Sequence, residues 1–153
     1  MEPTEVSIHI AAAPEAIYDL VADLPSMGKW SPECQRCDWL GGATAAAPGV
    51  KFKGRNRIGW RRWSTKGTVV AASPGEELSF DITSVFGLPV ARWSYRLEPD
   101  AGGVTVTETF EDKRGGTIKF LGTIVSGVGD REDHNRAGME ATLKRIKAAA
   151  EAG

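Results

Sequence analysis

The sequence predicts an α+β fold in which an antiparallel sheet packs against one long C-terminal helix. Between residues 50 and 111, apolar and polar side chains alternate in short runs that are separated by turns containing glycine or proline. This pattern is typical of antiparallel strands with one face toward a core and one toward water. Residues 130–152 instead repeat apolar side chains every three or four positions, as a helix does. At ~1.5 Å per residue, such a helix spans ~33 Å and needs the dry face of the sheet to cover it.

The first predicted elements are a strand and a helix. Residues 4–10 alternate apolar and polar side chains, which predicts a half-buried strand with His9 on its polar face. A helix is predicted to start at Pro14, because proline suits the first helical turn, and to end before Pro25. A short turn or second helix is expected up to Trp30.

The strands of the sheet are expected to follow one another along the chain with short turns between them. They are predicted at residues 33–40, 50–58, 62–72, 78–82, 91–99 and 104–111. A further helix is predicted from Thr117 to residue 128, and Asp130 is the expected N-cap of the long helix.

The long helix has an inward stripe that is apolar in its second half and polar in its first half. Counting by threes and fours gives Arg131, Asn135, Gly138, Met139, Thr142, Leu143 and Ile146. An unpaired buried polar group costs ~1–3 kcal/mol, so a packed core does not favour this order. A cavity beneath the first half of the helix accommodates it. The alternative is a structural network of polar groups at a wet end of the sheet.

Two polar residues interrupt the dry face of the sheet, Asn56 and Glu108. A carboxylate on a dry face needs a partner or a raised pKa, and Arg131 is its predicted partner. His134 lies one position from the inward stripe and is expected to be a flanking surface residue.

The only two cysteines, Cys34 and Cys37, form a C-x-x-C pattern that is found in redox and metal sites. A structural zinc site needs four ligands, and the sequence has no second cysteine pair. Residues three apart on a strand point to opposite faces. We therefore predict two reduced structural cysteines and no metal site.

Charge and length limit the classes of function. The 153 residues fit one domain spanning residues 1–153, and 19 basic against 20 acidic residues argue against a protein that mainly binds nucleic acid. No signal peptide or apolar run of membrane-spanning length is visible, so a soluble cytoplasmic protein without stable membrane association is expected. It is expected to be a monomer or homodimer.

The stretch GWRRWSTKG combines tryptophans and arginines at residues 59–67. Strand alternation predicts that Trp63 faces inward and that Trp60 lies at a turn, near the rim of the cavity. Five basic side chains then share the wet face: Lys51, Lys53, Arg55, Arg57 and Arg62. The favoured interpretation is a solvated sheet face. A nucleic-acid surface and a weak contact with an anionic membrane remain the alternatives.

The order of strand, helix pair, antiparallel strands and long C-terminal helix resembles the START-like helix-grip superfamily, SRPBCC. Within it, the chain resembles the actinobacterial polyketide cyclase/dehydrase-like proteins. The resemblance spans nearly the whole chain and is carried by the stretches IHIAAAPEAIYDLVADLPSMGKWSPEC, RWSTKGTVV, ARWSYRLEP and RAGMEATLKRIKAAAE. It implies a curved sheet wrapped around the long helix, with an elongated internal cavity and no metal or organic cofactor. Members bind lipids, sterols, polyketides or other apolar molecules, and some cyclise or dehydrate polyketide chains.

The resemblance also implies which residues line the cavity and bind a ligand. They are Phe52, Asn56, Trp63, Phe80, Trp93, Tyr95, Glu108, Phe110, Arg131, Asn135 and Met139.

Three functions compete at this stage. The favoured hypothesis is a protein that binds or transports a small hydrophobic molecule, whose polar end is oriented by Arg131, Asn56 and Glu108. The second is a cofactor-independent cyclase or dehydratase, with Glu108 as general acid or base and Arg131 stabilising an enolate. His134 is its candidate proton shuttle. The third is a regulatory interaction protein that uses the basic sheet face.

Overall fold

The computed structural model describes residues 3–84, 86–114 and 131–153, and for residues 131–133 the backbone only. In chain order the elements are β1 (Thr4–Ile10), α1 (Pro14–Ala22), the 3-10 helix η1 (Leu24–Lys29), β2 (Cys34–Trp39), β3 (Lys51–Ile58), β4 (Arg61–Ser73), β5 (Glu77–Thr83), β6 (Pro89–Asp100), β7 (Gly103–Asp112) and α3 (Arg131–Ala152). The predicted helix from Thr117 and the predicted cap Asp130 lie outside the described residues.

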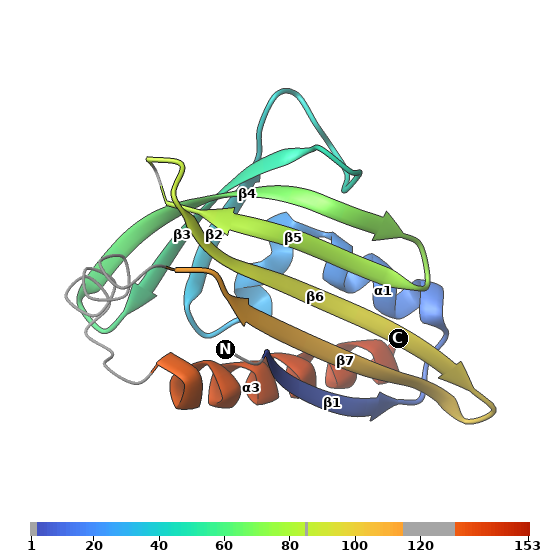
Figure 1. Cartoon of the computed structure of the whole chain (residues 1–153). Coiled ribbons are helices and arrows are strands. Elements are labelled where there is room, and N and C mark those ends of the chain that lie inside the picture. Colours follow the sequence, from blue (N-terminus) through green and yellow to red (C-terminus); the bar gives the residue numbers. More distant parts are fainter. Residues whose placement is uncertain (1–2, 85, 115–130) are drawn as a thin grey trace.

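The strands form one seven-stranded antiparallel sheet in the order β1-β7-β6-β5-β4-β3-β2. The sheet curves, and α3 lies along its concave side beside β1 and β7 (Figure 1). Helix α1 packs on β5, β6 and α3, and η1 packs on β2. The predicted α+β fold, a curved antiparallel sheet with a long C-terminal helix, is confirmed.

Alternation along each strand sets the buried face. On β7 the buried side chains are Val104, Val106, Glu108 and Phe110, and the threonines between them are half-buried. The turn from β6 to β7 is short, because Asp100 pairs directly with Gly103. Gly103 has a φ of 144° and its backbone approaches the carbonyl of Ile10, where a Cβ atom would overlap that oxygen. Glycine is therefore required at this corner.

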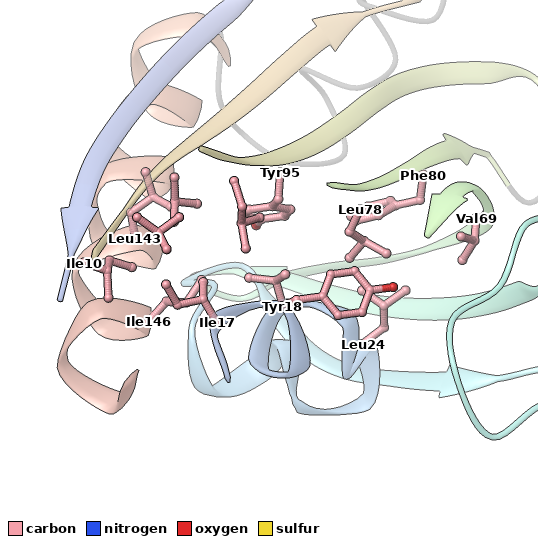
Figure 2. Close-up of a cluster of buried hydrophobic side chains, with 14 of the residues drawn as sticks. Ile10, Ile17, Tyr18, Leu24, Val69, Leu78, Phe80, Tyr95, Leu143 and Ile146 are labelled. Carbon is pink, nitrogen blue, oxygen red and sulfur yellow. The ribbon is translucent and has the colours of Figure 1, made fainter. Parts of the chain in front are cut away.

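The second half of α3 is anchored by a hydrophobic cluster. Leu143 and Ile146 pack with Ile17 of α1 and Ile10 of β1, and none of the four is more than 1% exposed. Figure 2 shows this cluster continuing to Leu78 and Tyr95 on the sheet. Burial of such side chains stabilises the fold by roughly 1.5–3 kcal/mol each. The apolar half of the predicted stripe is therefore core.

One strand departs from regular pairing. A β-bulge between Cys34 and Arg36 shifts the register of β2, so that Cys34 pairs with Asn56 and Cys37 pairs with Gly54. Residues 54 and 56 share one face of β3. The prediction that the two cysteines point to opposite faces is wrong, because the extra residue at the bulge returns both to the same face.

The aromatic packing on the sheet depends on the absence of a side chain at Gly67. It lies opposite Phe52, whose ring covers it and makes edge contacts with Phe80 and Trp39 at centroid distances of 5.4 and 6.2 Å. A methyl group at residue 67 would overlap that ring. We expect Gly67→Ala to lower the free energy of unfolding by about 1–3 kcal/mol in urea denaturation.

The matched control is Gly138→Ala. Gly138 lies in α3 with open space around its Cα, so alanine there is expected to stabilise the helix by up to about 1 kcal/mol. If both variants were as stable as the wild type, the Phe52 ring would not cover Gly67.

Candidate functional site

A cavity of about 390 Å³ lies between the first half of α3, η1 and the concave face of the sheet. Every predicted ligand-binding residue whose side chain is described lines it: Phe52, Asn56, Trp63, Phe80, Trp93, Tyr95, Glu108, Phe110, Asn135 and Met139. The sheet supplies most of the aromatic walls, and α3 supplies Asn135 and Met139 from its polar first half. The side chain of Arg131 lies outside the described residues.

Glu108 and Tyr95 form a hydrogen-bonded pair on the cavity wall. Each is 2% exposed, and the Tyr95 hydroxyl donates to Glu108 Oε2 at 2.8 Å. The two residues face each other on β6 and β7. The sequence contains the signal for this pairing, because the tight turn that sets Asp100 opposite Gly103 also sets Tyr95 opposite Glu108. The pairing of Glu108 with Arg131 stays a prediction.

Burial controls the charge of this pair. Desolvation raises the pKa of Glu108 to about 8, although the hydrogen bond from Tyr95 acts in the opposite direction. Burial, and then the neighbouring carboxyl, raise the pKa of Tyr95 well above its usual value. At neutral pH most of the Glu108 population is therefore a neutral carboxylic acid.

Two polar atoms in the cavity lining lack hydrogen-bond partners among the described residues. They are Glu108 Oε1 and Asn135 Nδ2, both fully shielded from solvent. Asn135 is 5% exposed and enters the cavity from α3. Buried polar groups are nearly always paired in proteins, so these two atoms can take a hydrogen-bonding group of a bound molecule.

Asn56, the other polar residue predicted on the dry face, has a different environment. Its Nδ2 donates to Thr65 Oγ1 on β4 at 3.3 Å. This amide is therefore partly satisfied by the sheet itself, although its side chain lines the cavity.

His134 is more buried than the sequence predicts. Its side chain is half-buried and lines the cavity, and Nε2 lies 2.7 Å from Glu33 Oε1. The contact ties the start of α3 to the segment before β2. The expectation of a flanking surface residue is corrected, because Glu33 draws the imidazole toward the cavity rim.

The two cysteines also line the cavity, as a consequence of the β-bulge. Both are free thiols. Burial raises the pKa of Cys34 to about 11 and that of Cys37 to about 12, so both stay protonated at neutral pH. Within the described part of the chain, no group of three or more His, Cys, Asp or Glu side chains could hold a metal ion.

The two tryptophans of the stretch GWRRWSTKG, residues 59–67, have different environments. Trp63 lines the cavity, whereas Trp60 is 79% exposed at the turn between β3 and β4. The basic side chains of these strands lie on the opposite face, where Arg55, Arg57 and Arg62 are exposed. Trp63 and these three arginines thus occupy different sides of the sheet, whereas the guanidinium of Arg61 lies over the exposed Trp60 ring, 4.5 Å from its centroid. None of the helices described is long and apolar enough to cross a membrane.

The raised pKa of Glu108 predicts that the stability of the protein depends on pH. Its pKa rises from 4.5 to about 8 on folding, so the folded protein keeps a proton that the unfolded chain releases. As the pH rises between these two values, the free energy of unfolding should therefore fall by about 1.4 kcal/mol per pH unit. Glu108→Gln should remove this contribution. The measurement is urea denaturation of both proteins at pH 5, 6 and 7, and parallel pH curves would show that Glu108 titrates near its usual pKa.

Comparisons with known proteins agree with this architecture. The family described as polyketide cyclase / dehydrase and lipid transport matches residues 1–151. The polyketide cyclase-like protein Cgl2372 from Corynebacterium glutamicum is 30% identical, with a TM-score of 0.63 over 95% of this chain and 88% of that chain. Protein CV1439 from Chromobacterium violaceum is 17% identical, with a TM-score of 0.73 over 99% of both chains.

A third similar structure is the di-domain ARO/CYC protein StfQ from the steffimycin biosynthetic pathway. It is 16% identical, with a TM-score of 0.71 over 97% of this chain and 50% of StfQ. No curated relative matches the sequence. The family match covers nearly the whole chain, and the helix-grip fold is shared with these structures. The chain therefore belongs to the polyketide cyclase/dehydrase and lipid transport family.

Proposed function

We propose that this protein binds or transports a small hydrophobic molecule in the cavity beneath α3. The observation that carries the proposal is a cavity of about 390 Å³ with a mostly apolar wall, in which two buried polar atoms lack partners among the described residues. Packed interiors contain few voids larger than a water molecule, whereas ligand sites typically have volumes of roughly 300–1,000 Å³. The cavity volume falls in the range of ligand sites.

The wall of the cavity favours a ligand with a flat apolar body. Phe52, Phe80, Trp93 and Phe110 present aromatic rings to it. Trp93 and Phe110 lie 4.8 Å apart between ring centroids, and the edge contacts of Phe52 hold a second aromatic pair. Removing apolar ligand surface from water against such rings contributes roughly 25 cal/mol per Å². The polar end of the ligand would lie near Glu108.

A cyclase or dehydratase is the second candidate, because the pKa of Glu108 lies near neutral pH. General acid–base catalysis works best with a group whose pKa is near the operating pH. Burial provides this property at Glu108, and Tyr95 holds the carboxyl group in place. The test is turnover of an aromatic polyketide precursor by wild type and by Glu108→Gln. Equal turnover by the two proteins would remove this mechanism.

The binding proposal is tested first by native mass spectrometry of protein purified without detergent. We expect a mass above that of the chain that is lost on denaturation. Titration of the delipidated protein with the neutral apolar fluorophore 1-aminoanthracene then gives an affinity. Gly138→Leu places a side chain in the open space of the cavity beneath α3 and should weaken this binding at least tenfold.

The matched control is Ala148→Leu, which adds a leucine to the exposed side of the same helix. Its affinity for the fluorophore should equal that of the wild type, and thermal unfolding should confirm that both variants fold. A wild-type protein that shows neither an extra mass nor fluorophore binding would contradict the proposed function.

A further inference from the structure

Glu108 Oε1 and Asn135 Nδ2, the two polar atoms of the cavity lining that lack partners among the described residues, are both hydrogen-bond donors at neutral pH. The Tyr95 hydroxyl donates to Glu108 Oε2, so Oε2 acts as the acceptor of that carboxyl group. The proton of the neutral acid is then on Oε1, the oxygen without a partner in the described chain. Asn135 Nδ2 can only donate. One donor enters from the sheet and the other from α3.

A ligand that satisfies two donors must supply acceptors. A carbonyl oxygen has two lone pairs and no proton of its own, so it can take a hydrogen bond from each side without adding a donor that needs a partner. We infer that the cavity selects uncharged molecules with a carbonyl oxygen, held by Glu108 and Asn135, over apolar molecules that end in a carboxylate. This inference rests on the proposed function and assigns the ligand class of the same site.

The preference against carboxylates follows from the charges among the described residues of the cavity lining. An anion that leaves water for an apolar site needs a cation or several donors to offset the lost hydration. Arg114 lines the cavity, but its guanidinium already donates to the carboxylate of Asp112 at 2.9 and 3.0 Å. His134 is held by Glu33. In the described lining, each of these two groups already has a carboxylate partner.

The donor at Glu108 depends on its proton, so carbonyl binding should depend on pH. Among the described residues, the titratable groups that line the cavity with Glu108 are Tyr95 from β6, Cys34 and Cys37 from β2, Glu33 just before β2, His134 from α3 and Arg114 after β7. Val6, which pairs with Glu108 from β1, has no titratable side chain. The thiols and Tyr95 keep their protons through pH 9, whereas Glu108 loses its proton above about pH 8.

The experiment compares two fluorescent dyes, the naphthyl ketone prodan and dimethylaminonaphthalene, which lacks the acyl group. For the delipidated wild type at pH 7, we expect at least tenfold tighter binding of the ketone. Its affinity should fall about tenfold between pH 7 and pH 9, and that of the acyl-free dye should not. Decan-2-one should displace prodan at a lower concentration than decanoate does.

Two variants separate the donors. In Glu108→Gln the amide nitrogen donates at every pH, so the ratio of the two dye affinities should stay the same at pH 7 and pH 9. In Asn135→Leu this ratio should fall about tenfold at pH 7, since one donor is lost while the number and branching of the side-chain heavy atoms are kept. Glu111→Gln changes a carboxyl on the same strand that does not line the cavity, and it should keep the wild-type pH dependence.

The outcomes are distinct. Equal wild-type affinities for the two dyes at both pH values, or displacement by decanoate at the same concentration as decan-2-one, would overturn the inference and leave the binding function standing. Binding of neither dye would contradict the proposed function itself. The pH dependence of the wild type tests the inference even if a variant fails to fold.

Discussion

The cavity exists because the two halves of α3 interact differently with the sheet. Leu143 and Ile146 pack against Ile17 and fix the second half of the helix in the hydrophobic cluster. The first half presents Asn135 and Gly138, which cannot fill the same space. The change from apolar to polar residues along the inward stripe of α3 therefore explains both why its second half packs in the core and why a cavity lies beneath its first half. The strands that face α3 supply the cavity wall, because their alternation places every second side chain on the concave face of the sheet.

Burial of Glu108 is an energetic cost of this arrangement. A carboxyl group in an apolar wall destabilises its charged form, and Tyr95 offsets only part of this through one hydrogen bond. This cost is limited because the carboxyl group of Glu108 stays mostly protonated at neutral pH. A leucine at residue 108 would pack without this penalty, so the carboxyl group is better explained by a ligand than by stability.

The sequence predicts the sheet and the cavity wall well, because both follow from alternation. The buried set of β7, including Glu108, was predictable from every second residue. The pairing of Tyr95 with Glu108 was also within reach, since the short β6–β7 turn fixes the register. The β-bulge beside Cys34 could not be predicted, because one inserted residue is not recognisable in the alternation of apolar and polar residues. The position of His134 depends on Glu33, about a hundred residues earlier, and helical spacing does not contain that information.

A binding protein and an enzyme would use the Glu108 proton in different ways. As a hydrogen-bond donor the carboxyl group keeps its proton, and the apolar wall that favours the neutral form also favours this role. As a general acid it would have to become an anion in that same wall, where the Tyr95 hydroxyl is its hydrogen-bond donor among the described residues. Catalysis would therefore require further stabilisation of the charged form by the substrate. The proposed binding role therefore uses the neutral form of Glu108 that burial favours, whereas a catalytic role would also need its charged form to be stabilised.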